Sequence, residues 1–261
     1  MFTFKLLSAF LKVNIQQALA YRADTILNLV MNLLWLGWEL VSLQIIFTNT
    51  SDLSGWGMGE MIALLGIWRL ANTMMSALVW PNTERFNQSI RDGTFDYVLI
   101  QPVNSQFLVT FSRIIVWRAW EIVLAGALVT VGISMGERAA SAGSVASFLA
   151  LAISGMAVLY SLWIVLIAFT FWFIKFDNNV TILQALMESG RFPATIYPAW
   201  LRFIITFVIP IAMATTVPLQ GLRGDLSGGQ VILFLAIGAV SVFISSRIWR
   251  AGVRRYSSAS S

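Results

Sequence analysis

Long apolar stretches separated by short polar segments run through almost the whole of this 261-residue chain. A helix crosses the hydrocarbon core of a bilayer when it holds roughly 20 mostly apolar residues. Five stretches meet this requirement: Ile26–Phe47, Met58–Trp80, Phe107–Ile133, Val145–Ile174 and Gln230–Ile248. The pattern therefore predicts an all-α integral membrane protein whose single transmembrane domain covers residues 1–261.

A further apolar segment, Leu201–Leu219, is interrupted by Pro210 and Pro218. Proline removes a backbone donor and clashes with the preceding helical turn, so the segment divides into two short pieces. Broken helices at membrane depth occur only where protein or a water-filled cavity covers them. Hydropathy alone nevertheless favours this segment as the fifth of six spans.

In the alternative arrangement, Asn178–Ile196 is the fifth span, and Trp200–Leu219 dips back from the outer side as a short helical hairpin within residues 197–222. Both arrangements give six transmembrane helices with the same ends. The second places Arg191 and Arg202 on the outer side.

The N-terminal segment does not resemble a signal peptide. Met1–Tyr21 mixes Lys5 and Lys12 with large apolar residues, and it has neither a clean apolar core nor a small-residue cleavage site. We expect an amphipathic helix over residues 1–23 that lies at the membrane interface with its cations on the polar side. A cytoplasmic extension of the first span is the alternative.

The distribution of Lys and Arg predicts the orientation, because cytoplasmic loops carry an excess of these residues. With the N-terminus inside, the outer loops hold only Arg138 and Arg223. The cations that then lie inside are Lys5, Lys12, Arg22, Arg85, Arg91, Arg113, Lys175, Arg247, Arg250, Arg254 and Arg255. Both termini are therefore expected in the cytoplasm, and anionic lipid rather than nucleic acid explains the basic tail of residues 247–261.

Composition removes several classes of function. Hydrophobic residues make up 58% of the chain and charged residues 11%, against about 45–50% and about 25% in soluble domains, which argues against a disordered chain or a soluble enzyme. The chain has no His and no Cys, so Ser-His and Cys-His catalysis is excluded and no metal site is expected. It also has no Walker A sequence with which to hold ATP.

The largest polar insertion, Pro81–Gln106, predicts a short cytoplasmic helix. Asn82 or Thr83 is placed to cap its start, and Gly93 to end it. Phe86 and Ile90, four residues apart, would form an exposed apolar spot that suits a partner protein. The basic residues at its rim are Arg85 and Arg91, and the acidic residues that could anchor the loop are Asp92 and Asp96. An ordinary solvated loop is the alternative.

Four charged residues fall within the predicted spans: Glu39, Arg69, Arg118 and Glu121. A charge at mid-bilayer costs roughly 2.5–3.5 kcal/mol on insertion scales, so these side chains must face protein or water. Glu39 and Arg69 lie at similar depths and can pair, and Arg118 and Glu121 are three residues apart on one helix. They either line a translocation path or fix helix packing.

Two stretches resemble the ABC type-2 permease family, the membrane subunits of ATP-binding-cassette exporters. IRDGTFDYVLIQPV (Ile90–Val103) is similar to the cytoplasmic loop of that family, and RFPATIYPAWLRFIITFVIP (Arg191–Pro210) is similar to the segment before its last span. The matching positions of the second stretch are Pro193, Pro198, Leu201, Arg202 and Pro210. The closest resemblance is to a bacterial branch with members assigned to viologen or drug efflux.

The resemblance implies a function and partners. It implies a non-catalytic permease in the bacterial cytoplasmic membrane that pairs with a second permease, a copy or a paralogue, and exports a hydrophobic or amphipathic substrate. Two separate ATPase subunits would hold ATP and Mg, and no cofactor would bind this chain. The positions then assigned to ATPase coupling are Arg85, Phe86, Ile90, Arg91, Asp92, Gly93 and Asp96. The family also has an extracellular re-entrant hairpin that gates the exit after its fifth span, so the resemblance favours the second arrangement, with Asn178–Ile196 as the fifth span and the hairpin at residues 197–222.

Two other classes of function stay open at this point. An ion-driven secondary transporter usually carries midplane carboxylates and inverted repeats; here only Glu39 and Glu121 are candidates, and no repeat is evident. A membrane-embedded enzyme would have few catalytic groups without His and Cys.

Overall fold

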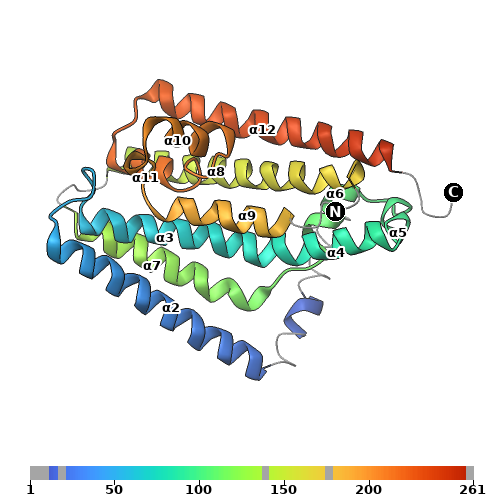
Figure 1. Cartoon of the computed structure of the whole chain (residues 1–261), viewed down its shortest axis with the longest axis horizontal. Coiled ribbons are helices and arrows are strands. Elements are labelled where there is room, and N and C mark those ends of the chain that lie inside the picture. Colours follow the sequence, from blue (N-terminus) through green and yellow to red (C-terminus); the bar gives the residue numbers. More distant parts are fainter. Residues whose placement is uncertain (1–11, 17–21, 137–140, 174–178, 257–261) are drawn as a thin grey trace.

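A computed structural model describes residues 12–16, 22–136, 141–173 and 179–256, which form a bundle of helices lying nearly side by side (Figure 1). Most of the interfacial helix predicted for residues 1–23 lies outside the described residues. The α-helices are α2 (Arg22–Asn49), α3 (Met58–Met74), α4 (Trp80–Arg91), α5 (Asp96–Leu99), α6 (Ser105–Phe111), α7 (Ala119–Ser134), α8 (Ala142–Ala168), α9 (Asn179–Glu188), α10 (Ala199–Phe203), α11 (Thr216–Arg223) and α12 (Gly228–Arg255).

Within the described ranges, five helices are long and apolar enough to cross a membrane: Thr25–Asn49, Met58–Arg91, Val116–Ser134, Ala142–Phe171 and Gly228–Arg255. Each corresponds to one of the five predicted stretches, so the chain is an all-helical membrane protein. Their large apolar side chains face outward in many places, as expected of helices that contact lipid rather than water.

The second span is longer than predicted and continues without a break into the polar insertion. A π-helical turn, Met75–Val79, joins α3 to α4 across Pro81. The carbonyl of Ala77, which a proline N–H cannot reach, instead accepts a hydrogen bond from the amide of Ile115 at 2.9 Å. The predicted helix start at Asn82 or Thr83 is therefore wrong, because the proline is accommodated and both side chains are buried.

The third span is shorter than predicted, because Phe107–Phe111 belongs to the separate helix α6. The chain turns between α6 and α7, and the buried amide of Asn82 holds this turn. Its nitrogen donates to the carbonyls of Thr110 and Arg113, at 2.9 and 2.7 Å, and its oxygen accepts from the amide of Arg113 at 3.0 Å. A polar residue expected to cap a helix thus connects two segments.

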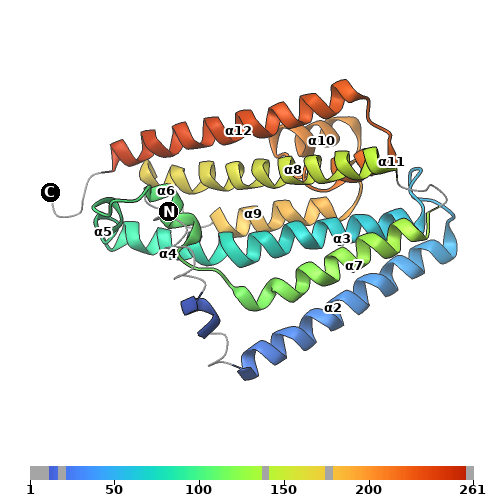
Figure 2. The same ribbon diagram turned by 180° about the vertical axis from the view of Figure 1, so that it is seen from behind.

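The region before α12 is not one continuous helix. After α9, two 3₁₀ turns, Ser189–Arg191 and Ala194–Ile196, precede α10. The apolar helical piece Ala199–Val208 is short, and the chain then reverses into α11. Leu201–Leu219 as a single span is therefore wrong. Of the predicted fifth span Asn178–Ile196, only the ten residues of α9 form an α-helix, so six long spans are not confirmed within the described residues. Figures 1 and 2 place α10 and α11 at the end of the bundle opposite α4, α5 and α6.

Helices α3 and α7 approach closely through glycine. A Cβ added to Gly132 of α7 would collide with the backbone of Gly59 and Ala63 in α3, and one added to Gly66 would lie 2.8 Å from the carbonyl oxygen of Ala125. Small residues at such contacts allow the backbones of membrane helices to touch.

We expect Gly132→Ala to destabilise the protein by about 1–3 kcal/mol. The added methyl group would clash with backbone atoms of α3, which cannot move aside as a flexible side chain can. Gly126→Ala on the same helix is the matched control, since a Cβ there has no neighbour within 4 Å. Thermal unfolding midpoints in detergent compare the two variants. A Gly132→Ala midpoint equal to that of Gly126→Ala would contradict this packing.

Candidate functional site

The projecting end of α4 differs from the predicted docking surface. Phe86 and Ile90 are buried, so their predicted exposure is wrong. The Phe86 ring is 5.3 Å from Phe95, 5.4 Å from Phe171 and 5.4 Å from Trp249, centroid to centroid. The apolar face of α4 is covered by the ends of α8 and α12, so the i, i+4 pair is part of a core rather than a surface.

The exposed apolar residues of this end lie a few positions later. Gly93, at φ 68°, ends the helix as predicted, because glycine adopts a left-handed conformation without strain. The chain then forms the short helix α5, where Tyr97 is 68% exposed and Ile100, directly after it, is 77% exposed. Sequence analysis missed both, although they lie within Ile90–Val103, the stretch that carries the resemblance.

The other predicted coupling residues surround this tip. Arg85, Arg91 and Asp92 are exposed on or beside α4. The carboxylate of Asp96 lies beside the hydroxyl of Tyr256; burial and this negative charge raise the pKa of Tyr256. Tyr256 directly follows α12, so Asp96 contacts the end of the last span. Its anchoring role stays a prediction.

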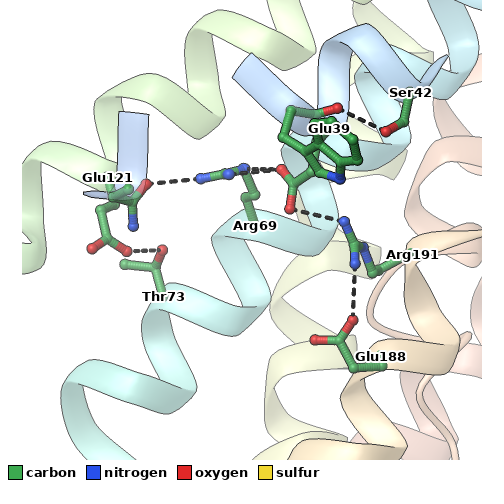
Figure 3. Close-up of polar contacts among 9 residues, drawn as sticks. Glu39, Ser42, Arg69, Thr73, Glu121, Glu188 and Arg191 are labelled. Carbon is green, nitrogen blue, oxygen red and sulfur yellow. Dashed lines mark hydrogen bonds and ion pairs between the residues drawn. The ribbon is translucent and has the colours of Figure 1, made fainter. Parts of the chain in front are cut away.

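Two predicted ion pairs are confirmed in the membrane region. Arg69 of α3 is 2.6 Å from Glu39 of α2 (Figure 3). It also donates to Asn32 at 2.9 Å. Arg118 lies 3.1 Å from Glu121, whose other oxygen accepts a hydrogen bond from Thr73 of α3 at 2.9 Å. Glu39 and Glu121 are both buried. The carboxylates therefore connect α3 to α2 and to α7.

Arg191 completes the first pair, and sequence analysis missed its role. Its guanidinium donates to the second oxygen of Glu39 at 2.9 Å and to Glu188 at 3.2 Å (Figure 3). It also stacks over the ring of Trp68, 4.9 Å from the centroid. Trp68 in turn donates its indole N–H to the carbonyl of Met187 at 2.7 Å. Glu39 thus bridges α2, α3 and the segment that leads into the hairpin.

The predicted gate residues shape the hairpin that follows. Pro193 and Pro198 stand directly before the 3₁₀ turn Ala194–Ile196 and before α10, and Pro210 lies where the chain reverses. Leu201 packs against a small core inside the hairpin. Arg202 donates to the carbonyl of Thr195 at 2.9 Å.

Protein covers the returning half of the hairpin. Residues 211–219 are all buried. The backbone of Met213 packs so closely against Gly155 of α8 that a Cβ at Gly155 would collide with the carbonyl oxygen of Met213. Trp56, in the loop before α3, donates its indole N–H to Thr195 at 2.8 Å. Irregular backbone at membrane depth requires such cover, so the arrangement is compatible with a segment that enters the bilayer and returns.

The chain matches the model of a known protein family over most of its length. The model of a family described as ABC-2 family transporter protein matches residues 33–260, a range that includes every residue of the α4–α5 tip, the charge network and the hairpin. No curated protein matches the chain.

Proposed function

Because the chain belongs to the ABC-2 family of transporter proteins, we propose that it is the permease subunit of an ATP-driven exporter. It would move a hydrophobic or amphipathic substrate outward from the cytoplasm or the inner leaflet of a bacterial cytoplasmic membrane. ATP and Mg would be held by two separate ATPase subunits, and a second permease, identical or paralogous, would complete the path.

One structural observation carries this proposal: the helix of the second span runs unbroken from Met58 to Arg91. It holds Arg69 of the charge network and leads to the exposed Tyr97 and Ile100. A continuous helix transmits displacement along its axis, so a force applied at the tip reaches the network and, through Arg191, the hairpin. The tip would therefore be the docking site of the ATPase, and the hairpin the outer gate.

The positions of the helix ends support the orientation that the charges predict. Helix α2 begins, and helix α12 ends, on the side of the bundle that carries α4 and α5 (Figure 2). With that end in the cytoplasm, Arg85, Arg91 and Arg254 lie inside. Both termini would then be cytoplasmic, and α10 and α11 would lie at the outer surface.

Changing Tyr97 and Ile100 together to serine is expected to abolish ATPase assembly while leaving the fold unchanged, because exposed side chains contribute little to stability. The tagged chain is purified from its native host, and bound subunits are identified by a Walker A sequence and by ATP hydrolysis. Val123→Ser, also a strongly exposed apolar position, is the control on α7. Undiminished assembly and hydrolysis in the double variant would contradict docking at the tip.

A further inference from the structure

A polar cavity of about 600 Å³ lies beside the junction of α3 and α4, and its lining includes neither the exposed Tyr97 and Ile100 nor any residue of the hairpin. Ser76, Trp80, Glu84 and Arg91 line it from this continuous helix, and Arg113 and Arg118 line it from the chain that leads into α7. Its volume is in the usual range for small-molecule sites, about 300–1,000 Å³.

The chemistry of the cavity favours an anion. Its lining includes three arginines, Arg91, Arg113 and Arg118, and one acidic residue, Glu84. Arg118 uses one terminal nitrogen to bind Glu121. Its Nε–H and the indole N–H of Trp80 are buried and have no acceptor within the described part of the chain. These groups are donors that require acceptor oxygens, and arginine matches the oxygens of a phosphate particularly well.

The depth of the cavity indicates where such an anion would be found. Trp80 is about 33 Å along the helix from Met58 at the opposite end, taking ~1.5 Å per residue. The hydrocarbon core is about 30 Å thick, so Trp80 and Arg118 lie where the core meets the headgroups. Arg91 lies beyond this level, on the side of the α5 tip. In the orientation proposed above, this is the inner leaflet.

We propose that this cavity binds the phosphate group of an anionic amphiphile whose apolar part remains in the inner leaflet. Arg113 and the free Nε–H of Arg118 donate to the phosphate oxygens, and Arg91 adds positive charge from the cytoplasmic side. That the bound amphiphile is the exported substrate rests on the proposed exporter function. That the cavity binds its phosphate group rests on the lining of the cavity alone.

The test is a binding measurement on the whole chain in neutral detergent, with no ATPase present. The probes are short-chain phosphatidylglycerol, short-chain phosphatidylcholine and inorganic phosphate, titrated by calorimetry. Arg113→Gln is expected to raise the Kd for phosphatidylglycerol about tenfold, the loss of one charge-assisted hydrogen bond. Glu84→Gln is expected to lower this Kd, since it removes the opposing carboxylate. Phosphatidylcholine is expected to bind more weakly and to distinguish the variants less.

Arg250→Gln on α12 is the matched control, because Arg250 is exposed at the same end of the bundle but lies outside the cavity. It is expected to change the Kd less than twofold. Equal Kd values for Arg113→Gln and Arg250→Gln would overturn the site. Inorganic phosphate binding as tightly as phosphatidylglycerol would overturn the amphiphile as its ligand. Neither result bears on ATPase assembly at Tyr97 and Ile100, so failure here is distinct from failure of the proposed function.

Discussion

Replacing Glu39 by glutamine is expected to lower the free energy of unfolding by about 3–5 kcal/mol, the usual cost of removing one partner from a buried ion pair. The carboxylate is 8% exposed and receives both Arg69 and Arg191. A neutral amide removes the counter-charge of Arg69 in the membrane region and leaves Arg191 with the exposed Glu188 as its acidic partner. Unfolding in mixed detergent–SDS micelles, followed by the fluorescence of the tryptophans, measures the loss.

Glu188→Gln provides the matched control. Glu188 also binds Arg191, but it is 56% exposed, so the pair contributes no more than about 1 kcal/mol. The double variant Glu39→Met/Arg69→Met should be more stable than Glu39→Gln alone, because a buried pair replaced by apolar groups leaves one charge fewer unpaired. Similar losses for Glu39→Gln and Glu188→Gln would show that the network contributes nothing beyond a surface pair.

Phe86→Ala is expected to cost about 3–5 kcal/mol and to reduce ATPase assembly, because the ring fills the core that fastens α4 to α8 and α12. It makes close ring contacts with Phe95, Phe171 and Trp249. Removing it leaves a cavity beneath the α5 tip, so the docking surface is no longer held in place. Thermal unfolding and ATPase copurification are measured on the same preparations.

Phe173→Ala is the control, since this neighbouring aromatic side chain is mostly exposed. The two readouts together distinguish a residue that stabilises the fold from residues that contact the ATPase directly. Phe86→Ala should lower both the unfolding midpoint and assembly, whereas the Tyr97 and Ile100 double variant should lower assembly alone. An unfolding midpoint for Phe86→Ala as high as that of Phe173→Ala would disprove the role of Phe86 as a core residue.

Tryptophan shows how the network and the tip are held in place. Trp163 of α8 donates its indole N–H to Thr83 of α4 at 2.7 Å, and Trp249 of α12 donates to Ser105 of α6 at 3.1 Å. Trp68 and Trp56 make the corresponding bonds near the hairpin. Each of these bonds joins segments that are distant in sequence, so the four indoles connect the tip and the hairpin to the rest of the bundle.

Local sequence determined the membrane spans because hydrophobic length is a local property. The five long stretches, the end of α4 at Gly93 and the break near Pro210 follow from apolar runs and from the geometry of glycine and proline. The pairs Glu39–Arg69 and Arg118–Glu121 were also predictable, since a bilayer allows a buried charge few partners other than an opposite charge at similar depth.

Tertiary structure decided which faces are covered. Phe86 and Ile90 have the spacing of an exposed docking face and of a core face alike, and only the arrival of Trp249 and Phe171 from distant segments makes them core. The helix continues past Pro81 because the amide of Ile115 donates to the carbonyl of Ala77, which a proline cannot do. Sequence by itself therefore determined that this chain lies in a membrane and where most of its helices run. The tertiary structure decided that Arg191 joins Glu39 and that the tip presents Tyr97 and Ile100, because burial depends on neighbours that no local pattern contains.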